Sequence, residues 1–146
     1  MKSKVSLKIV LGSESKPKIA YASVLFGKNP QQTYEVAKKI KEKNFKAIKF
    51  GWEKFGSNLI NDSEHLVAAR DALGNEIKLM IDVGAIWGNN LEEACKREKI
   101  FKDANITWLE EPFYSDAFYE YSELSKLTNL PLAGGESCHS VNSAKN

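Results

Sequence analysis

Five short, β-rich apolar runs recur along the chain and alternate with longer stretches of helical periodicity. The apolar runs cover residues 19–24, 46–50, 77–82, 106–110 and 131–135. The helical stretches lie between them, at residues 31–44, 63–73, 91–104 and 116–128. Because neighbouring parallel strands are joined by a helical crossover of about this length, the pattern predicts right-handed strand–helix–strand units and a parallel sheet.

Residues that favour helix ends support this division. Pro30 begins the first predicted helix, where its missing N–H costs nothing, and Gly74 stands where the second needs a C-cap. We expect Asp62 or Ser63 to cap the start of that second helix, and we expect His65 within it to lie on a surface helix with a structural role. Residues 140–146 resemble the opening of one more helix.

Two α/β architectures have strands and helices in this order. An open, doubly wound sheet that binds nucleotides or phosphate requires a glycine-rich loop after its first strand, and SVLFGKNP has neither glycine pattern. A (β/α) barrel instead brings the carboxyl ends of all its strands to one face. We therefore predict an α/β fold that is a partial TIM (β/α) barrel, incomplete at both ends, with residues 19–146 forming strands one to five.

Composition excludes several classes of function. The chain has 146 residues, enough for one domain, and its 42% hydrophobic and 27% charged content is ordinary for a globular protein. A net charge of +2 with scattered lysines indicates no nucleic-acid partner, and no apolar run reaches membrane-spanning length. Two distant cysteines without metal-binding spacing favour a reducing, cytoplasmic location.

Three carboxylates are the most informative chemistry in the sequence. Asp82, Glu110 and Glu136 each follow a successive predicted strand, almost evenly spaced by one strand–helix unit. In a barrel these positions converge, and three converging carboxylates repel one another unless a cation lies between them. A site made only of oxygen ligands favours a hard cation such as Mg²⁺.

Four strings around these acids, KAIKFGW, MIDVGAIW, WLEEP and AGGES, occur in an order and spacing that resemble the mandelate racemase and muconate-lactonizing branch of the enolase superfamily. The resemblance covers roughly residues 8–146. It implies that Asp82, Glu110 and Glu136 bind Mg²⁺, and that a base removes the α-proton of a small carboxylate substrate to give a metal-stabilised enediolate. An acid-sugar dehydratase is the implied activity, with a racemase or epimerase as the alternative.

In that family the base comes from a Lys-x-Lys pair at the end of the second strand, and here the corresponding residues are Lys49, Phe50 and Gly51. Lys49 alternates in register with Ala47, so it should project into the mouth of the barrel. Near a metal its pKa is expected to fall. Because the second lysine is replaced by Gly51, it stays open whether Lys49 is the base or only orients the substrate.

Other residues near these motifs are candidates for substrate contact. Trp52, Trp87 and His139 fall in the predicted loops. The alternatives are aromatic packing for Trp52, covering the top of the barrel for Trp87, and an ordinary loop position without function for His139. Glu111 points away from the ligand Glu110 and is expected to support it from behind. The family often has asparagine where this chain has Gly84.

The resemblance also implies what lies outside these five strands. Residues 1–18 read as a linker with a remnant of the N-terminal capping domain that governs specificity, and the strands that supply the partner acid or base are missing. We therefore expect the isolated chain to be inactive and the intact parent to be a homo-oligomer. A second hypothesis is a non-catalytic half-barrel that pairs with another chain to cover its open edges.

Overall fold

The computed structural model describes residue 5, residues 7–12 and residues 16–141. Its strands form one five-stranded sheet in the order β1-β2-β3-β4-β5, and every neighbouring pair is parallel. The elements, in chain order, are α1 (Leu7–Val10), β1 (Ala22–Leu25), α2 (Pro30–Glu42), β2 (Ala47–Gly51), α3 (Leu59–Leu73), β3 (Lys78–Asp82), α4 (Leu91–Cys95), α5 (Glu98–Asp103), β4 (Ile106–Glu110), α6 (Phe118–Leu127) and β5 (Leu132–Ala133).

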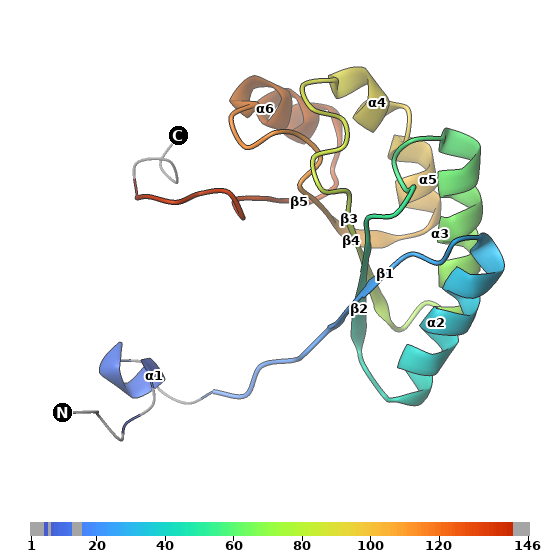
Figure 1. The fold of residues 1–146 in the computed structure, drawn as a ribbon, viewed down its shortest axis with the longest axis horizontal. Helices are drawn as coiled ribbons and strands as arrows, with labels where there is room; N and C mark the ends of the chain where they lie inside the picture. Colours follow the sequence, from blue (N-terminus) through green and yellow to red (C-terminus); the bar gives the residue numbers. More distant parts are fainter. Residues whose placement is uncertain (1–4, 6, 13–15, 142–146) are drawn as a thin grey trace.

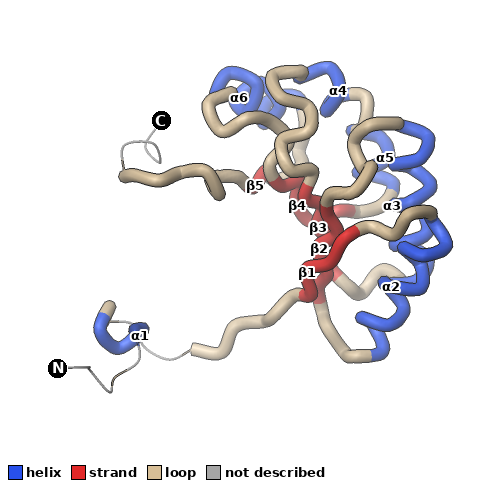
Figure 2. Tube along the Cα trace, in the orientation of Figure 1, coloured by secondary structure: helices blue, strands red, loops and turns tan. Residues whose placement is uncertain are grey.

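The sheet is curved, and its helices cover one side. Figures 1 and 2 show α2, α3 and α5 along the same face, while α1 and the described segment after β5 lie on the other side of the sheet. Strands alternating with helices on the outside of a curved parallel sheet are the arrangement of a (β/α) barrel. The α/β fold class predicted from the sequence is confirmed.

Alternation along the strands divides buried core from site. Ile48 and Phe50 of β2 are completely buried and belong to the hydrophobic cluster that α3 completes with Leu66 and Leu73. Successive side chains of a strand point to opposite faces, so Lys49, between these two core residues, points away from the helices. Packing of the β2 core residues therefore determines which way Lys49 faces.

The helix ends agree with the sequence in two places and differ in two. Pro30 is the first residue of α2, and Gly74 caps α3 with φ 70°, as predicted. The expectation that Asp62 or Ser63 caps α3 was wrong: α3 begins at Leu59, because the side chain of Asn58 accepts the Asn61 N–H. The predicted helix over 91–104 is divided into α4 and α5.

The end of the described chain has little regular structure. β5 has two residues, shorter than the predicted 131–135 run, and Ser140 and Val141 are not helical. The remainder of the predicted last helix, residues 142–146, lies outside the described residues. Among the helices that are described, none has the length and apolar character required to cross a membrane.

His65 is buried, with 3% of its surface exposed, so the expectation of a surface position was wrong. Its Nδ1 lies 2.7 Å from Oγ1 of Thr33, which also accepts the N–H of Gly27. The histidine thus connects α3 to the start of α2. Burial lowers the pKa of His65, and the nearby Asp62 and Glu64 carboxylates oppose that shift only in part.

This burial predicts a pH dependence of stability. The unfolded chain binds a proton at His65 near its ordinary pKa of 6.5, whereas the folded chain binds it only at lower pH. The stabilising contribution is therefore fully present above the unfolded pKa, and it is lost as the pH falls from there through the folded pKa. Urea unfolding between about pH 7.5 and 5.5 should show this loss.

The chain has two histidines, so the other serves as a control. In His65→Gln the slope of unfolding free energy against pH should be smaller than in the native chain. His139→Gln, at an exposed position, should keep the native slope. Equal slopes in native chain and His65→Gln would contradict the assignment.

Candidate metal centre

Strand register places two of the predicted ligands side by side. Gly51, Asp82 and Glu110 are Cα partners across β2, β3 and β4, each at the last position of its strand. The row continues to Ala133 of β5. Because all strands run parallel, this row is the carboxyl edge of the sheet, where barrel folds place their active sites.

A single ammonium group lies between the two carboxylates. Nζ of Lys49 donates to Oδ2 of Asp82 at 3.0 Å and to Oε1 of Glu110. All three side chains are largely buried, with exposed fractions of 12%, 10% and 19%. Burial lowers the pKa of Lys49, but the hydrogen bonds and charges of the two carboxylates outweigh it and raise the pKa overall. The fall in the Lys49 pKa that is expected beside a metal stays a prediction.

The second oxygen of each carboxylate has its own donor. Oδ1 of Asp82 accepts the Gly84 N–H at 3.1 Å, and Oε2 of Glu110 accepts the Trp108 indole N–H at 3.0 Å. Trp108 also meets Tyr21 edge to face, with ring centroids 6.0 Å apart. Sequence reasoning missed both aromatic residues. Trp108 is two residues before Glu110 on the same strand, so period-two alternation places it on the same face.

Glu136 does not join this pair. It lies in the segment after β5, where the residue is exposed. In the part of the chain that the structure describes, no three His, Cys, Asp or Glu side chains come together so as to hold a metal ion. The structure therefore brings together two of the three predicted ligands, and metal binding by Asp82, Glu110 and Glu136 stays a prediction.

Glu111 holds the segment that carries Glu136. Its Oε1 accepts the N–H groups of Gly135, at 2.6 Å, and of Glu136, at 2.9 Å, and its Oε2 accepts the Tyr121 hydroxyl at 3.2 Å. Glu111 is 4% exposed. Burial and the adjacent carboxylate raise the pKa of Tyr121, which keeps its hydroxyl protonated as a donor. The Glu111 carboxylate thus joins the segment after β5 to α6.

The other candidates occupy different surroundings. Trp52 is 57% exposed, and its indole packs beside Gly84. The backbone N–H of Trp52 donates to the Asp82 carbonyl at 3.2 Å. Trp87 is buried and donates its indole N–H to the Gly56 carbonyl at 2.8 Å. His139 lies exposed beyond β5. Substrate contact by these three residues stays a prediction.

Close packing explains the glycine in the lysine motif. A Cβ at Gly51 would lie 3.0 Å from the Asp82 carbonyl oxygen and 3.1 Å from its Cβ. A longer side chain there would crowd Asp82.

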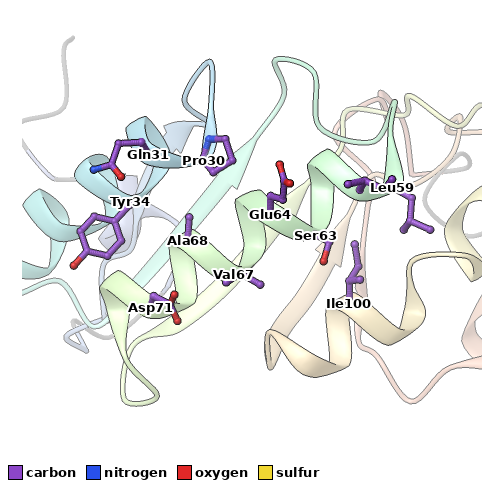
Figure 3. Close-up of a pocket in the computed structure, with 11 residues that line it drawn as sticks. Pro30, Gln31, Tyr34, Leu59, Ser63, Glu64, Val67, Ala68, Asp71 and Ile100 are labelled. Carbon is purple, nitrogen blue, oxygen red and sulfur yellow. The ribbon is translucent and has the colours of Figure 1, made fainter.

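A more open groove lies elsewhere on the molecule. Figure 3 shows it on the outer side of α2 and α3, lined by Tyr34, Leu59, Val67 and Ile100 among others. It contains none of the residues that the sequence predicted as metal ligands, base or substrate contacts. The carboxyl edge of the sheet, and not the groove, therefore carries the candidate chemistry.

The donor set at this edge suits a hard cation. Two carboxylates in neighbouring positions already share one cation, the Lys49 ammonium, and they present oxygen donors. Mg²⁺ prefers such oxygens, and no histidine or cysteine takes part in these contacts.

Comparison with known proteins identifies the family of this chain. The family described as enolase C-terminal domain-like matches residues 32–146. A solved structure described as a predicted mandelate racemase from Rhodobacter sphaeroides is 38% identical and superposes with a TM-score of 0.84 over 88% of this chain and 33% of that one. L-talarate/galactarate dehydratase of Salmonella typhimurium is 32% identical over 54% of this chain and 19% of its own length.

A third similar protein was solved with metal and ligand. The dipeptide epimerase of Cytophaga hutchinsonii, complexed with Mg and the dipeptide D-Ala-L-Val, is 25% identical, with a TM-score of 0.83 over 95% of this chain and 36% of that one. The chain spans about a third of the length of both solved proteins. Similar proteins thus include both lyases and isomerases. By this match and its fold, the chain belongs to the mandelate racemase and muconate-lactonizing branch of the enolase superfamily.

Proposed function

We propose that this chain forms the metal-binding part of a Mg²⁺-dependent enzyme that removes the α-proton of a small carboxylate substrate, most specifically an acid-sugar dehydratase. The observation that carries the proposal is the cation shared by Asp82 and Glu110 at the carboxyl edge of the sheet. Two carboxylates fixed this close favour a cation between them, and a divalent ion satisfies them more fully than one ammonium group.

Asp82 and Glu110 would hold the ion, with Glu136 as the third ligand. The Glu136 backbone is anchored through Glu111, while its own side chain is exposed and free to turn. Bound Mg²⁺ would supply positive charge to the substrate carboxylate and so offset the negative charge that develops as the α-proton leaves. Trp108 would orient the Glu110 carboxylate, and Glu111 would hold the backbone that carries Glu136; metal affinity commonly depends on such supporting contacts.

Lys49 is the proposed base. Its ammonium lies at the carboxylate pair, beside the oxygens that would hold the ion. With an ion held by the two carboxylates, the interactions that raise the Lys49 pKa would be lost, while burial and the added positive charge would lower it. A neutral amine beside the substrate can then accept the proton.

The substrate class and final reaction come from similarity. The dehydratase relative supports loss of water from an acid sugar. The epimerase, with a TM-score of 0.83, supports return of a proton to the α-carbon as the alternative. The open sheet edges at β1 and β5 support a further alternative, a half-barrel paired with a second chain. A cytoplasmic location and a homo-oligomeric parent belong to the same proposal.

The first prediction concerns metal binding to the chain itself. Calorimetric titration with Mg²⁺ should show one site, and Glu110→Gln should weaken it by more than about tenfold, the lower end of what even outer-shell partners contribute. Asp71→Asn removes the same charge at an exposed position of α3 and should bind as the native chain does. Absence of binding, or equal affinity in Glu110→Gln, would contradict the metal assignment.

The second prediction concerns proton removal. With Mg²⁺ in deuterated water, the chain should exchange the α-proton of an aldonate or aldarate for deuterium. This half-reaction needs only the base and the metal, and proton NMR measures its rate. Lys49→Met should slow exchange by about a hundredfold or more, the usual contribution of a general base. Lys46→Met, whose ammonium contacts Asn44 just before β2, should keep the native rate. Equal rates in native chain and Lys49→Met would remove Lys49 from the mechanism.

The third prediction concerns Glu111. Hydrogen bonds to charged groups contribute about 1.5–3 kcal/mol, so Glu111→Gln should speed amide exchange at Gly135 and Glu136 by about tenfold or more. The same variant should bind Mg²⁺ more weakly, because the backbone carrying Glu136 is less fixed. Glu76→Gln, at an exposed position, is the matched control and should change neither measurement. Unaltered protection of both amides in Glu111→Gln would rule out this anchoring role.

A further inference from the structure

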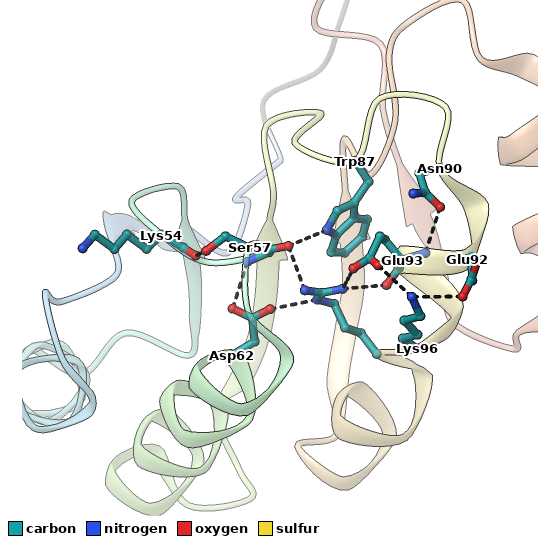
Figure 4. A network of polar contacts seen from close by, with 10 residues as sticks. Lys54, Ser57, Asp62, Trp87, Asn90, Glu92, Glu93 and Lys96 are labelled. Carbon is teal, nitrogen blue, oxygen red and sulfur yellow. Dashed lines mark hydrogen bonds and ion pairs between the residues drawn. The ribbon is translucent and has the colours of Figure 1, made fainter.

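Arg97 and Asp62 form a buried ion pair within the network of polar contacts that Figure 4 shows around Asp62, Trp87 and Glu93. Nε of Arg97 donates to Oδ2 of Asp62 at 2.8 Å, and the two side chains are 1% and 0% exposed. The guanidinium also donates to the side chain and carbonyl of Glu93 and lies 5.0 Å from the Trp87 ring. Burial raises the pKa of Asp62, although Arg97 and a backbone N–H oppose it.

The backbone held by this pair is Gly56, in the middle of the segment between β2 and α3. Its N–H donates to Oδ1 of Asp62 at 2.9 Å, and its carbonyl accepts from Arg97 at 2.7 Å and from the Trp87 indole at 2.8 Å. A Cβ at Gly56 would lie 2.6 Å from Cγ2 of Ile86. The Trp87 indole thus joins residues 52–58 to residues 83–90, the segment after β3, and Arg97 and Asp62 hold the Gly56 backbone at this junction.

These two segments contain unfavourable backbone conformations. Trp52, Glu53 and Ala85 have φ values of 64°, 59° and 59°, in the left-handed region that non-glycine residues rarely adopt. Such a conformation is strained and persists only where its surroundings enforce it. A buried ion pair is weak evidence for stability alone, so fixing a particular conformation is the better account of this one.

These two segments meet again at the candidate site. The Trp52 N–H donates to the Asp82 carbonyl, and the Trp52 indole would lie 3.5 Å from a Cβ at Gly84. Gly84 in turn donates its N–H to the Asp82 carboxylate. The position of Trp52 therefore depends on the same two segments that the Trp87 indole joins.

We propose that Arg97 and Asp62 are positioning residues that hold Trp52 beside Asp82 as one wall of the substrate site. Resting on the proposed function for its consequence, this assignment gives Trp52 a fixed apolar face against which the carbon chain of the substrate lies. Neither Arg97 nor Asp62 touches the substrate. Both act through Gly56 and the backbone that follows β2.

The test uses the full chain labelled with 5-fluorotryptophan and needs neither substrate nor metal. The three tryptophans give three fluorine resonances, and Trp52→Phe identifies the one from Trp52. In Arg97→Met this resonance should broaden or divide, because residues 52–58 are no longer held in one conformation. The Gly56 amide should exchange at least about tenfold faster than in the native chain.

Arg70→Met is the matched control. Arg70, on α3, is a half-buried guanidinium that donates to four backbone carbonyls, those of Gly74, Ile77, Ala104 and Asn105. Its loss should lower the urea midpoint while leaving the Trp52 resonance in place. A merely structural role for Arg97 would give the same result in both variants.

Arg97→Lys is the second variant, used if Arg97→Met does not fold. It keeps the charge opposite Asp62 but not the fork that also reaches Gly56, so the Trp52 resonance should again broaden. A folded variant with the native Trp52 resonance overturns the proposal. Failure to bind Mg²⁺ would instead reject the proposed function and leave the fluorine result unaffected.

Discussion

Repulsion between two carboxylates in adjacent strands is the constraint on which this site depends. Parallel pairing fixes Asp82 beside Glu110, and the two cannot separate without breaking the sheet between β3 and β4. Their charges therefore require a cation in the low-dielectric environment of a largely buried pair. Lys49 supplies it in this structure, since β2 is the neighbouring strand and its alternation turns that side chain away from the helices.

The same constraint explains why the surrounding loops are held so firmly. A ligand set works only when its members keep their geometry, and a barrel takes those members from different strand ends. Glu111 holds the segment after β5 through two backbone N–H groups. Arg97 and Asp62 hold Gly56 in the segment after β2, and the Trp87 indole joins that segment to the one after β3. Among the described residues, six non-glycine residues have positive φ, and four of them, Trp52, Glu53, Ala85 and Glu111, follow β2, β3 or β4, so the backbone strain collects where the chemistry is proposed.

Local patterns were sufficient to predict the strands, the parallel sheet and the pairing of two acids. Period-two alternation and strand–helix spacing depend on nearby residues, and they placed Lys49, Asp82 and Glu110 correctly at one edge. The buried position of His65 depends on a tertiary contact with Thr33, which local patterns do not reveal. The early start of α3 depends on a local cap, Asn58, which the sequence analysis overlooked in favour of Asp62 and Ser63. The Arg97–Asp62 pair joins residues 35 positions apart, which no local pattern reveals. Glu136 lies three residues beyond the two-residue strand β5, so strand alternation does not predict which way its side chain points.

The central claim is that the Lys49 ammonium marks the position of a divalent cation. Crystals of the chain grown with Mn²⁺ in place of Mg²⁺ test it directly, because the ion's anomalous scattering locates it without reference to activity. The account predicts one peak at coordination distance from Asp82, Glu110 and Glu136, with the Lys49 ammonium moved away from both carboxylates. A map with no peak at this edge and Lys49 still bound to Asp82 and Glu110 would contradict it.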